Sequence, residues 1–144
     1  MLNAQHYIQE LKNIHAEIAG ESALRDVAVT CIDKHDREIH FTPCHQINEK
    51  LADLMFIFTW EYKAAVNHRA LAACLAKFYY GFIAIHPFKD ANRRTAFIFL
   101  INRAEEQGYH LFSIALLRKC LFEGKVQAEM EKLTALFTHM LKPA

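Results

Sequence analysis

Apolar residues recur every three or four positions along most of this chain, which is the spacing of one buried face of an α-helix. The predicted helices cover residues 7–18, 47–59, 71–83, 92–107, 114–121 and 126–140. The helix that starts at Asn92 is apolar on nearly all sides between Ala96 and Ile101, which indicates a central position in a bundle. Gly20 and Gly108 are the predicted stops of the first and fourth helices.

Two short runs with β character interrupt the helical pattern. They are Val27–Ile32 and Glu38–Thr42, and the polar turn Asp33–Arg37 separates them, so they predict a hairpin that Pro43 ends. A hairpin of this size is by itself most often a small structural excursion. The predicted fold class is therefore mainly α with one small β-hairpin, in a single domain spanning residues 1–144.

Charge, apolar run lengths and the N-terminal residues limit the classes of partner and the location that we expect. The net charge of +1 and the lack of a long basic block argue against a nucleic-acid partner. The longest apolar runs are far shorter than the ~20 residues that span a bilayer, so we expect no membrane association. The N-terminal residues do not have the pattern of a secretory signal, so we expect a cytoplasmic protein, although export by another signal stays open.

Two residue types that often bind metals have spacings that favour a structural role. Four cysteines (Cys31, Cys44, Cys74 and Cys120) show neither metal-ligand spacing nor a disulfide-rich density, and are predicted to be reduced and mostly buried. Histidines at 35, 40 and 45 recur every five residues, which matches one face of neither a helix nor a strand. We therefore expect no metal site at these histidines.

The most informative segment runs from His86 to Arg94, His-Pro-Phe-Lys-Asp-Ala-Asn-Arg-Arg, between the third and fourth predicted helices. His86 is a candidate general base, because an imidazole with a pKa of about 6.5 accepts a proton near neutral pH. Asp90 offers an oxygen suited to Mg²⁺. Asn92, the amides that begin the next helix and the Arg94 guanidinium form a candidate phosphate site. Each residue taken singly is more often structural.

The segment resembles the signature of the Fic/Doc (Fido) family, His-Pro-Phe-x-Asp/Glu-Gly-Asn-Gly-Arg. The matching residues are His86, Pro87, Phe88, Asp90, Asn92 and Arg94. The chain departs from it at Ala91 and Arg93, where most Fic members have glycine. The resemblance covers roughly residues 28–110, with helical flanks at 1–20 and 113–141, and it implies the Fic helical bundle with the hairpin as a flap over the active site.

The resemblance also implies an activity. Fic proteins transfer a phosphate-containing group, most often AMP from Mg-ATP, to a Ser, Thr or Tyr hydroxyl of a target protein. The resemblance implies that His86 is the general base and that Asp90 binds Mg²⁺. The residues implied to bind the nucleotide and its phosphates are Lys89, Ala91, Asn92, Arg93 and Arg94. The residues implied to form the target-binding flap are Ile39, His40, Phe41 and Thr42.

The departures keep three functions open. Ala91 is a mild change if its φ is negative, whereas Arg93 puts a long cation where space for the nucleotide is usual. Doc proteins have a similar Asp-Ala-Asn-Lys-Arg pattern and are kinases that deliver the γ-phosphate of ATP. Phe97 stands where many AMP-transferring members have a second arginine. The three functions are AMP transfer, a Doc-like protein kinase and a catalytically inactive binding module.

The sequence also bears on how such an activity would be restrained. It contains no Ser/Thr-x-x-x-Glu-Gly/Asn segment of the kind that inhibits some Fic proteins; the nearest, Ser22–Asp26, lacks the glutamate and the final residue. Restraint would therefore come from a separate inhibitory protein, such as an antitoxin. Both a toxin role and an effector role stay open.

Overall fold

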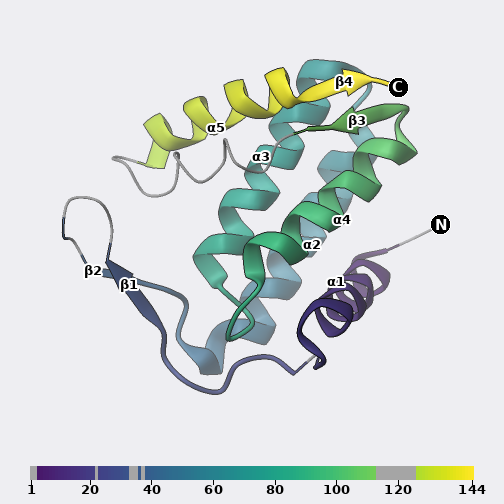
Figure 1. The fold of residues 1–144 in the computed structure, drawn as a ribbon. Helices are drawn as coiled ribbons and strands as arrows, with labels where there is room; N and C mark the ends of the chain where they lie inside the picture. Colours follow the sequence, from purple (N-terminus) through teal and green to yellow (C-terminus); the bar gives the residue numbers. More distant parts are fainter. Residues whose placement is uncertain (1–2, 22, 33–35, 37, 113–125) are drawn as a thin grey trace.

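The computed structural model describes residues 3–21, 23–32, 36, 38–112 and 126–144, and forms a helical bundle with a hairpin extending from one end (Figure 1). The predicted class, mainly helical with one small hairpin, is confirmed. The helices are α1 (Ala4–Ala19), α2 (Ile47–Ala64), α3 (His68–Ile85), α4 (Asn92–Glu106) and α5 (Val126–Met140), with a short 3-10 turn η1 (Cys44–Gln46) before α2. The predicted helix over 114–121 lies outside the described residues.

Helix α3 is the centre of the bundle and packs against α2, α4 and α5 (Figure 1). Aromatic rings fill the space between the helices: Phe58 and Phe78 lie 5.1 Å apart between ring centroids, and Phe78 and Phe99 lie 5.0 Å apart. Tyr7 of α1 contacts Phe99 edge-on at 5.5 Å. Aromatic rings in tilted or edge-on contact stabilise a fold beyond what the burial of their apolar area contributes. This cluster therefore fixes how α1 to α4 pack against one another.

The helix ends follow ordinary capping rules. The Asn3 side chain accepts a hydrogen bond from the His6 amide, and Gly20 ends α1 with a left-handed φ of 80°. Helix α2 runs past the predicted stop near Thr59 to Ala64, because Tyr62 is also buried. The Tyr62 hydroxyl lies 2.9 Å from the backbone oxygen of Arg103, which ties the end of α2 to α4.

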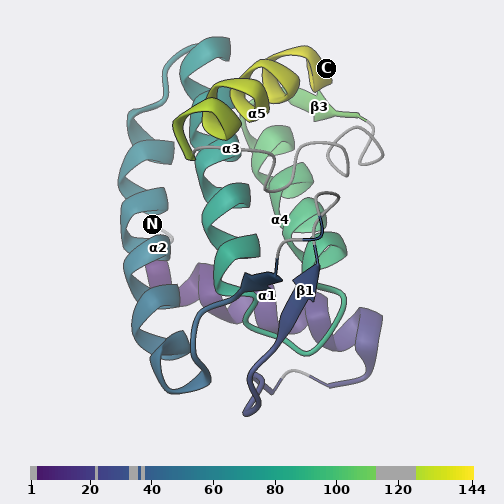
Figure 2. The same cartoon turned by 90° about the vertical axis from the view of Figure 1, so that its left-hand side faces the viewer.

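The predicted hairpin is present, with shorter strands than the sequence runs. Strand β1 (Thr30–Ile32) pairs antiparallel with β2 (Glu38–His40), and Cys31 lies opposite Ile39 (Figure 2). Its base is joined to the bundle, because the Thr42 amide donates to the Ala84 oxygen of α3 at 3.2 Å. This bond places residues 41 and 42 beside the C-terminal end of α3.

A second antiparallel pair lies at the other end of the bundle and was not predicted. Strand β3 (Tyr109–Leu111) pairs with β4 (Leu141–Pro143), the last element of the chain. Three residues per strand are too few to give a readable alternation of apolar and polar positions. No helix among the described residues is long and apolar enough to cross a membrane.

Candidate active site

The His86–Arg94 segment forms a tight loop whose two ends have left-handed backbone. His86 follows α3 with φ 53° and its amide donates to the Phe82 oxygen at 2.9 Å, while Ala91 precedes α4 with φ 57°. Asn92 shapes the loop from inside: its side chain accepts from the Phe88 amide at 3.0 Å and donates to the Phe88 oxygen at 2.9 Å. Both polar ends of this buried amide are used within the loop, so Asn92 sets the backbone conformation of the loop.

Phe88 anchors the loop against α1. Its ring is fully buried and stacks on the His15 imidazole, with 3.7 Å between centroids and 7° between the planes. The His15 Nδ1 atom lies 2.6 Å from the backbone oxygen of Glu21, and its Nε2 atom lies 3.2 Å from the backbone oxygen of Asp90. His15 was not among the predicted site residues, although its position one turn after Leu11 on the apolar face of α1 is a signal. Helix α1 therefore supports the motif loop directly.

Arg25 joins the hairpin to the loop. This buried side chain donates from Nε to the His86 oxygen at 2.5 Å and from its terminal nitrogens to the oxygens of Val27, at 2.7 Å, Ile85, at 3.1 Å, and Thr42. The Arg25 amide also donates to the Pro87 oxygen at 2.8 Å. A buried guanidinium with this many carbonyl partners is satisfied by hydrogen bonds alone. Arg25 was not among the predicted site residues, because it lies in a segment without helical or strand periodicity.

His86 sits between these supports with its ring half-buried. The Phe41 ring from the hairpin stacks on the imidazole at 4.2 Å between centroids and 18° between planes. Burial, and then the positive charges of Arg25 and Arg93, lower the pKa of His86 to about 4. The imidazole is therefore neutral at neutral pH and able to accept a proton.

Asp90, the predicted Mg²⁺ ligand, is exposed on the loop. The Asp90 carboxylate is 76% exposed and its Oδ1 lies 3.6 Å from His15 Nε2. The described residues contain no group of three or more potential metal ligands. Since Mg²⁺ commonly takes one or two carboxylates and completes its shell with water and substrate phosphates, Asp90 fits a Mg²⁺ ion that arrives with a nucleotide.

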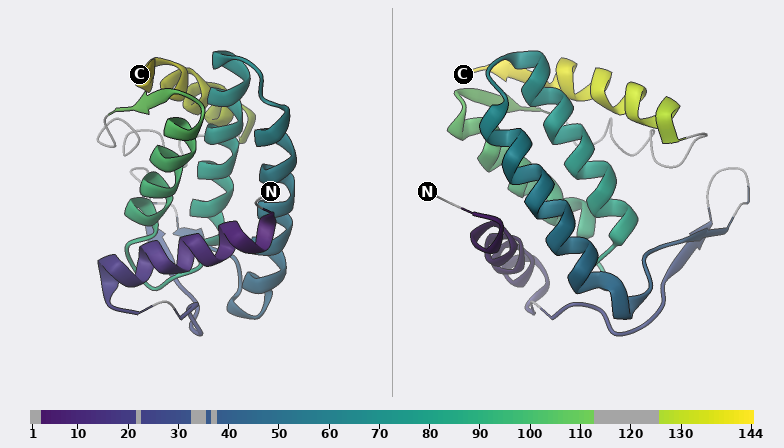
Figure 3. Two further views of the ribbon diagram at one scale, coloured as in Figure 1. Left: turned by 90° about the vertical axis from the view of Figure 1, so that its right-hand side faces the viewer. Right: turned by 180° about the vertical axis from the view of Figure 1, so that it is seen from behind.

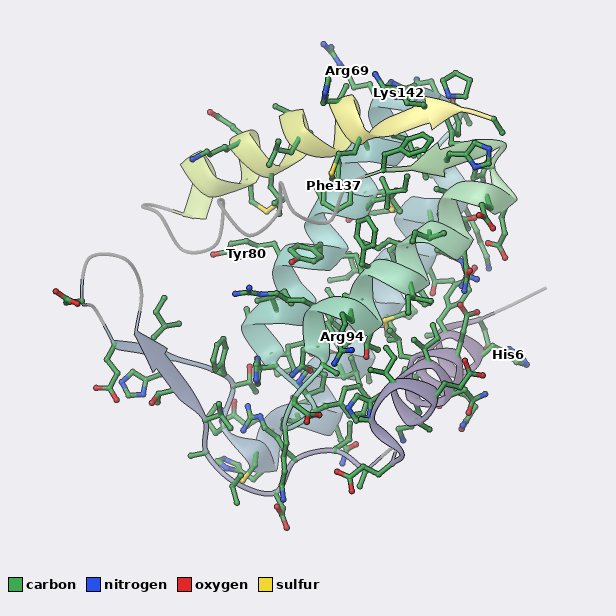
Figure 4. The ribbon with its side chains drawn as sticks, in the orientation of Figure 1. His6, Arg69, Tyr80, Arg94, Phe137 and Lys142 are labelled. Carbon is green, nitrogen blue, oxygen red and sulfur yellow. The ribbon has the colours of Figure 1, made fainter. Side chains whose placement is uncertain are left out.

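The first turn of α4 supplies positive charge beside His86. Arg93 and Arg94 are exposed there, and no side chain caps the amides that begin the helix. Figure 4 places Arg94 at the same end of the bundle as the motif loop. Unpaired helix N-terminal amides and nearby guanidinium groups together favour an anion. Lys89 is also exposed in this loop.

Ala91, Arg93 and Phe97 are the three positions at which the chain departs from the Fic/Doc pattern. The φ of Ala91 is positive, so the condition under which alanine would be a mild change is not met, and the backbone here is of the kind that favours glycine. Arg93 lies inside α4 and does not have a positive φ, so glycine is not needed for its backbone. Phe97 is buried in the core and brings no cation to the site.

The four predicted flap residues divide into two pairs. Phe41 contacts His86 and Thr42 accepts from Arg25, so both lie at the site. Ile39 and His40 lie in β2, farther along the hairpin, with Ile39 half-buried and His40 exposed. Among the described residues, β2 pairs only with β1, so its outer edge is open to another strand.

Comparison with solved structures supports the fold. The chain is 15% identical to BepC, an effector of Bartonella tribocorum with bound AMPPNP, covering 95% of this chain and 75% of that one with a TM-score of 0.77. It is 18% identical to the ADP-bound N-terminal Fic domain of a putative cell filamentation protein from Bartonella quintana, at 94% and 73% coverage and a TM-score of 0.79. A Fic-domain signalling protein from Bacteroides thetaiotaomicron, 12% identical, covers 95% and 64% with a TM-score of 0.67.

Comparison with curated protein sequences gives no match. The family profile described as "Fic/DOC family" matches residues 5–102, which include α1 from its second residue, the hairpin and the motif loop. These residues make up more than half of the chain, and they contain every contact described above for His86, Phe88 and Asn92. The chain therefore belongs to the Fic/DOC family.

Proposed function

We propose that this protein transfers AMP from Mg-ATP to a Ser, Thr or Tyr hydroxyl of a target protein. The observation that carries the proposal is the neutral His86 imidazole, held in place by Arg25 and Phe41 next to the open N-terminus of α4. His86 takes the proton of the target hydroxyl as its oxygen bonds to the α-phosphorus, and the bond to the leaving pyrophosphate breaks. Mg²⁺ supplies charge neutralisation on the phosphates when bound with ATP.

In the proposed substrate complex, the bound nucleotide raises the low pKa of His86. A pKa of about 4 makes His86 a weak proton acceptor. Phosphates bound at Arg93 and Arg94 add negative charge next to the imidazole, which raises its pKa toward neutrality. His86 is thus a better base in the substrate complex than in the free protein.

The hairpin is the feature that favours a protein as the substrate. An extended target segment that adds to the open edge of β2 is held by main-chain hydrogen bonds, whatever its side chains are. Phe41 follows β2 directly and lies on the His86 ring. Register along the flap therefore determines which hydroxyl of the target reaches the base.

One observation favours a second function, a Doc-like kinase. After burial and Arg25, the positive charge of Arg93 also lowers the pKa of His86, so this guanidinium acts on the candidate base. Phe97 in the core leaves the distal phosphates of the usual pose without a cation one turn along α4. Both features fit a nucleotide bound in the reverse sense, with its γ-phosphate at His86 and ADP as the leaving group.

Parallel reactions with α-labelled and γ-labelled ATP, Mg²⁺ and a lysate separate these functions. AMP transfer labels a protein from the α position only, and kinase activity labels it from the γ position only. Because His86 has a left-handed φ, His86→Asn is the better inactive control than His86→Ala: asparagine tolerates this backbone. Either variant should lower transfer by about 10²–10⁴-fold. No label from either position would leave the inactive binding module.

The double variant Ala91→Gly with Arg93→Gly tests what fixes the reaction. If Arg93 enforces the reverse nucleotide pose, wild-type protein labels from the γ position and the double variant shifts label toward the α position. Transfer from the α position by wild type would contradict the kinase alternative. Single Ala91→Gly is the control, since it changes the loop backbone without removing the cation.

A further inference from the structure

The outward face of α2 carries large apolar side chains that the bundle does not cover. Phe56 is 61% exposed and Trp60 68% exposed. They line a groove of about 690 Å³ with Lys63 and Ala64, and the start of α1 forms its other wall. Seen from behind, α2 lies in front of the other helices of the bundle (Figure 3). Large exposed aromatic residues that cluster on one face mark an interaction surface.

The spacing on this face is that of a helix-pairing seam. Asp53, Phe56, Trp60 and Lys63 are all exposed and follow one another at intervals of three, four and three residues. This is the alternation of the two contact positions in a coiled coil, where the ridges of one helix fit the grooves of another. The partner that this seam fits is therefore another helix.

The charges on the seam are self-complementary. When α2 is placed antiparallel to a second α2 about a two-fold axis at the level of residue 58, Asp53 lies opposite Lys63 and Phe56 lies opposite Trp60. Both pairs share that centre, so a single axis satisfies them. Within the described part of the chain, neither Asp53 nor Lys63 forms an ion pair or a hydrogen bond, so both charges are available to a partner.

The positions beside the seam agree with the same axis. Glu49 lies opposite Asn67, Lys50 opposite Val66, and Ala52 opposite Ala64. No two like charges are brought together, and the small alanines let the helices approach closely. A self-complementary surface with these properties is what a two-fold homodimer requires.

We propose that the Asp53–Phe56–Trp60–Lys63 face of α2 is a homodimer interface, and that its occupant is the antiparallel α2 of a second copy of this chain. Phe56 of one copy packs on Trp60 of the other in the groove, and two Asp53–Lys63 ion pairs flank this aromatic centre. Aromatic residues at the centre with charged residues at the rim is the usual anatomy of a specific interface. The motif loop takes no part in the contact.

Sedimentation velocity of the full chain, from low to upper micromolar concentration, tests the association. Trp60 is the single tryptophan of the chain, so its fluorescence reports burial of the seam. We expect the mass to approach that of a dimer and the emission to shift to the blue over the same concentration range. A monomer at all concentrations, or a dimer whose Trp60 emission does not change, would overturn the proposal.

A charge swap identifies the partner helix. Asp53→Lys or Lys63→Asp alone places like charges opposite each other, and each should weaken dimerisation by about tenfold. The two together restore opposite charges and should restore wild-type association. Lys50→Asp, which makes the same charge change opposite Val66, is the matched control and should associate as wild type does. Circular dichroism checks that each variant folds, and a double variant no better than the singles would assign the contact to another face.

Discussion

The Arg25 guanidinium donates from Nε to the backbone oxygen of His86 at 2.5 Å, across 61 positions of sequence. The same side chain donates to the backbone oxygen of Thr42, so one residue holds both the candidate base and the attachment point of the hairpin. A change in how the hairpin is attached should therefore alter the position of the candidate base, His86. This coupling gives the first prediction.

Arg25→Lys should loosen the flap and destabilise the fold. Lysine keeps the positive charge, but one ammonium group cannot reach the four carbonyl oxygens that the guanidinium satisfies, so about 2–3 kcal/mol of unfolding free energy should be lost. Denaturant unfolding measures the loss, and hydrogen exchange at the Thr42 amide should become faster. Arg69→Lys, on the exposed surface at the opposite end of the bundle (Figure 4), is the control and should change neither.

The pH dependence of catalysis should reveal the lowered pKa of His86. The free protein needs its imidazole neutral, so kcat/KM should stay on its plateau as pH falls through 6.5 and decline only near pH 4. The midpoint in kcat should lie higher, because phosphates in the complex offset the nearby arginines. Equal midpoints in the two profiles would mean that bound nucleotide does not act on His86.

The same pKa shift affects stability. Because the pKa of His86 is lower in the folded protein than in the unfolded chain, protonation favours unfolding; the contribution is present above pH 6.5 and is lost as pH falls from there to about 4. The melting temperature of His86→Asn should therefore depend less on pH in this window than that of wild type. Parallel curves for the two proteins would contradict the shift.

Ala91→Gly should stabilise the protein. A left-handed backbone costs an L-residue about 1–2 kcal/mol, and part of the gain is offset by the greater freedom of glycine in the unfolded chain. The net expected gain is about 0.5–1 kcal/mol in denaturant unfolding. Ala73→Gly, at an exposed position inside α3, should instead lose about 1 kcal/mol. Losses of similar size in both variants would mean that the backbone at residue 91 is not left-handed.

Two substitutions of His15 separate its ring stacking from its hydrogen bonds. His15→Phe keeps an aromatic ring on Phe88 but removes the imidazole N–H, so one backbone oxygen, that of Glu21 or that of Asp90, loses its donor, which should cost about 1–3 kcal/mol. His15→Ala also opens a cavity and should cost more. Both should weaken Mg-nucleotide binding in calorimetry, since the loop that holds Asp90 loses a support. Unchanged affinity in both variants would limit His15 to a role in folding.

The sequence predicted the parts of this protein that depend on local pattern. Helical periodicity located the α3 and α4 segments, and the spacing from His86 to Arg94 located the loop between them. The contacts of Arg25 and His15 were not predictable, because each joins residues about 60 or more positions apart and neither residue type signals its partners. The sign of φ at Ala91 was also not predictable, since alanine rarely adopts a left-handed backbone.

The attachment of the hairpin bears on how this protein could change its targets over evolution. Arg25 and Thr42 close the segment between them at its base, and the loop that carries His86 is held there by contacts that lie outside the hairpin strands. Changing the strands, or lengthening them, costs little closure entropy once the base is fixed. Under the proposed function, new target preferences can therefore be acquired by changing the two strands, while Phe41 keeps its contact with His86 and the motif loop stays as it is.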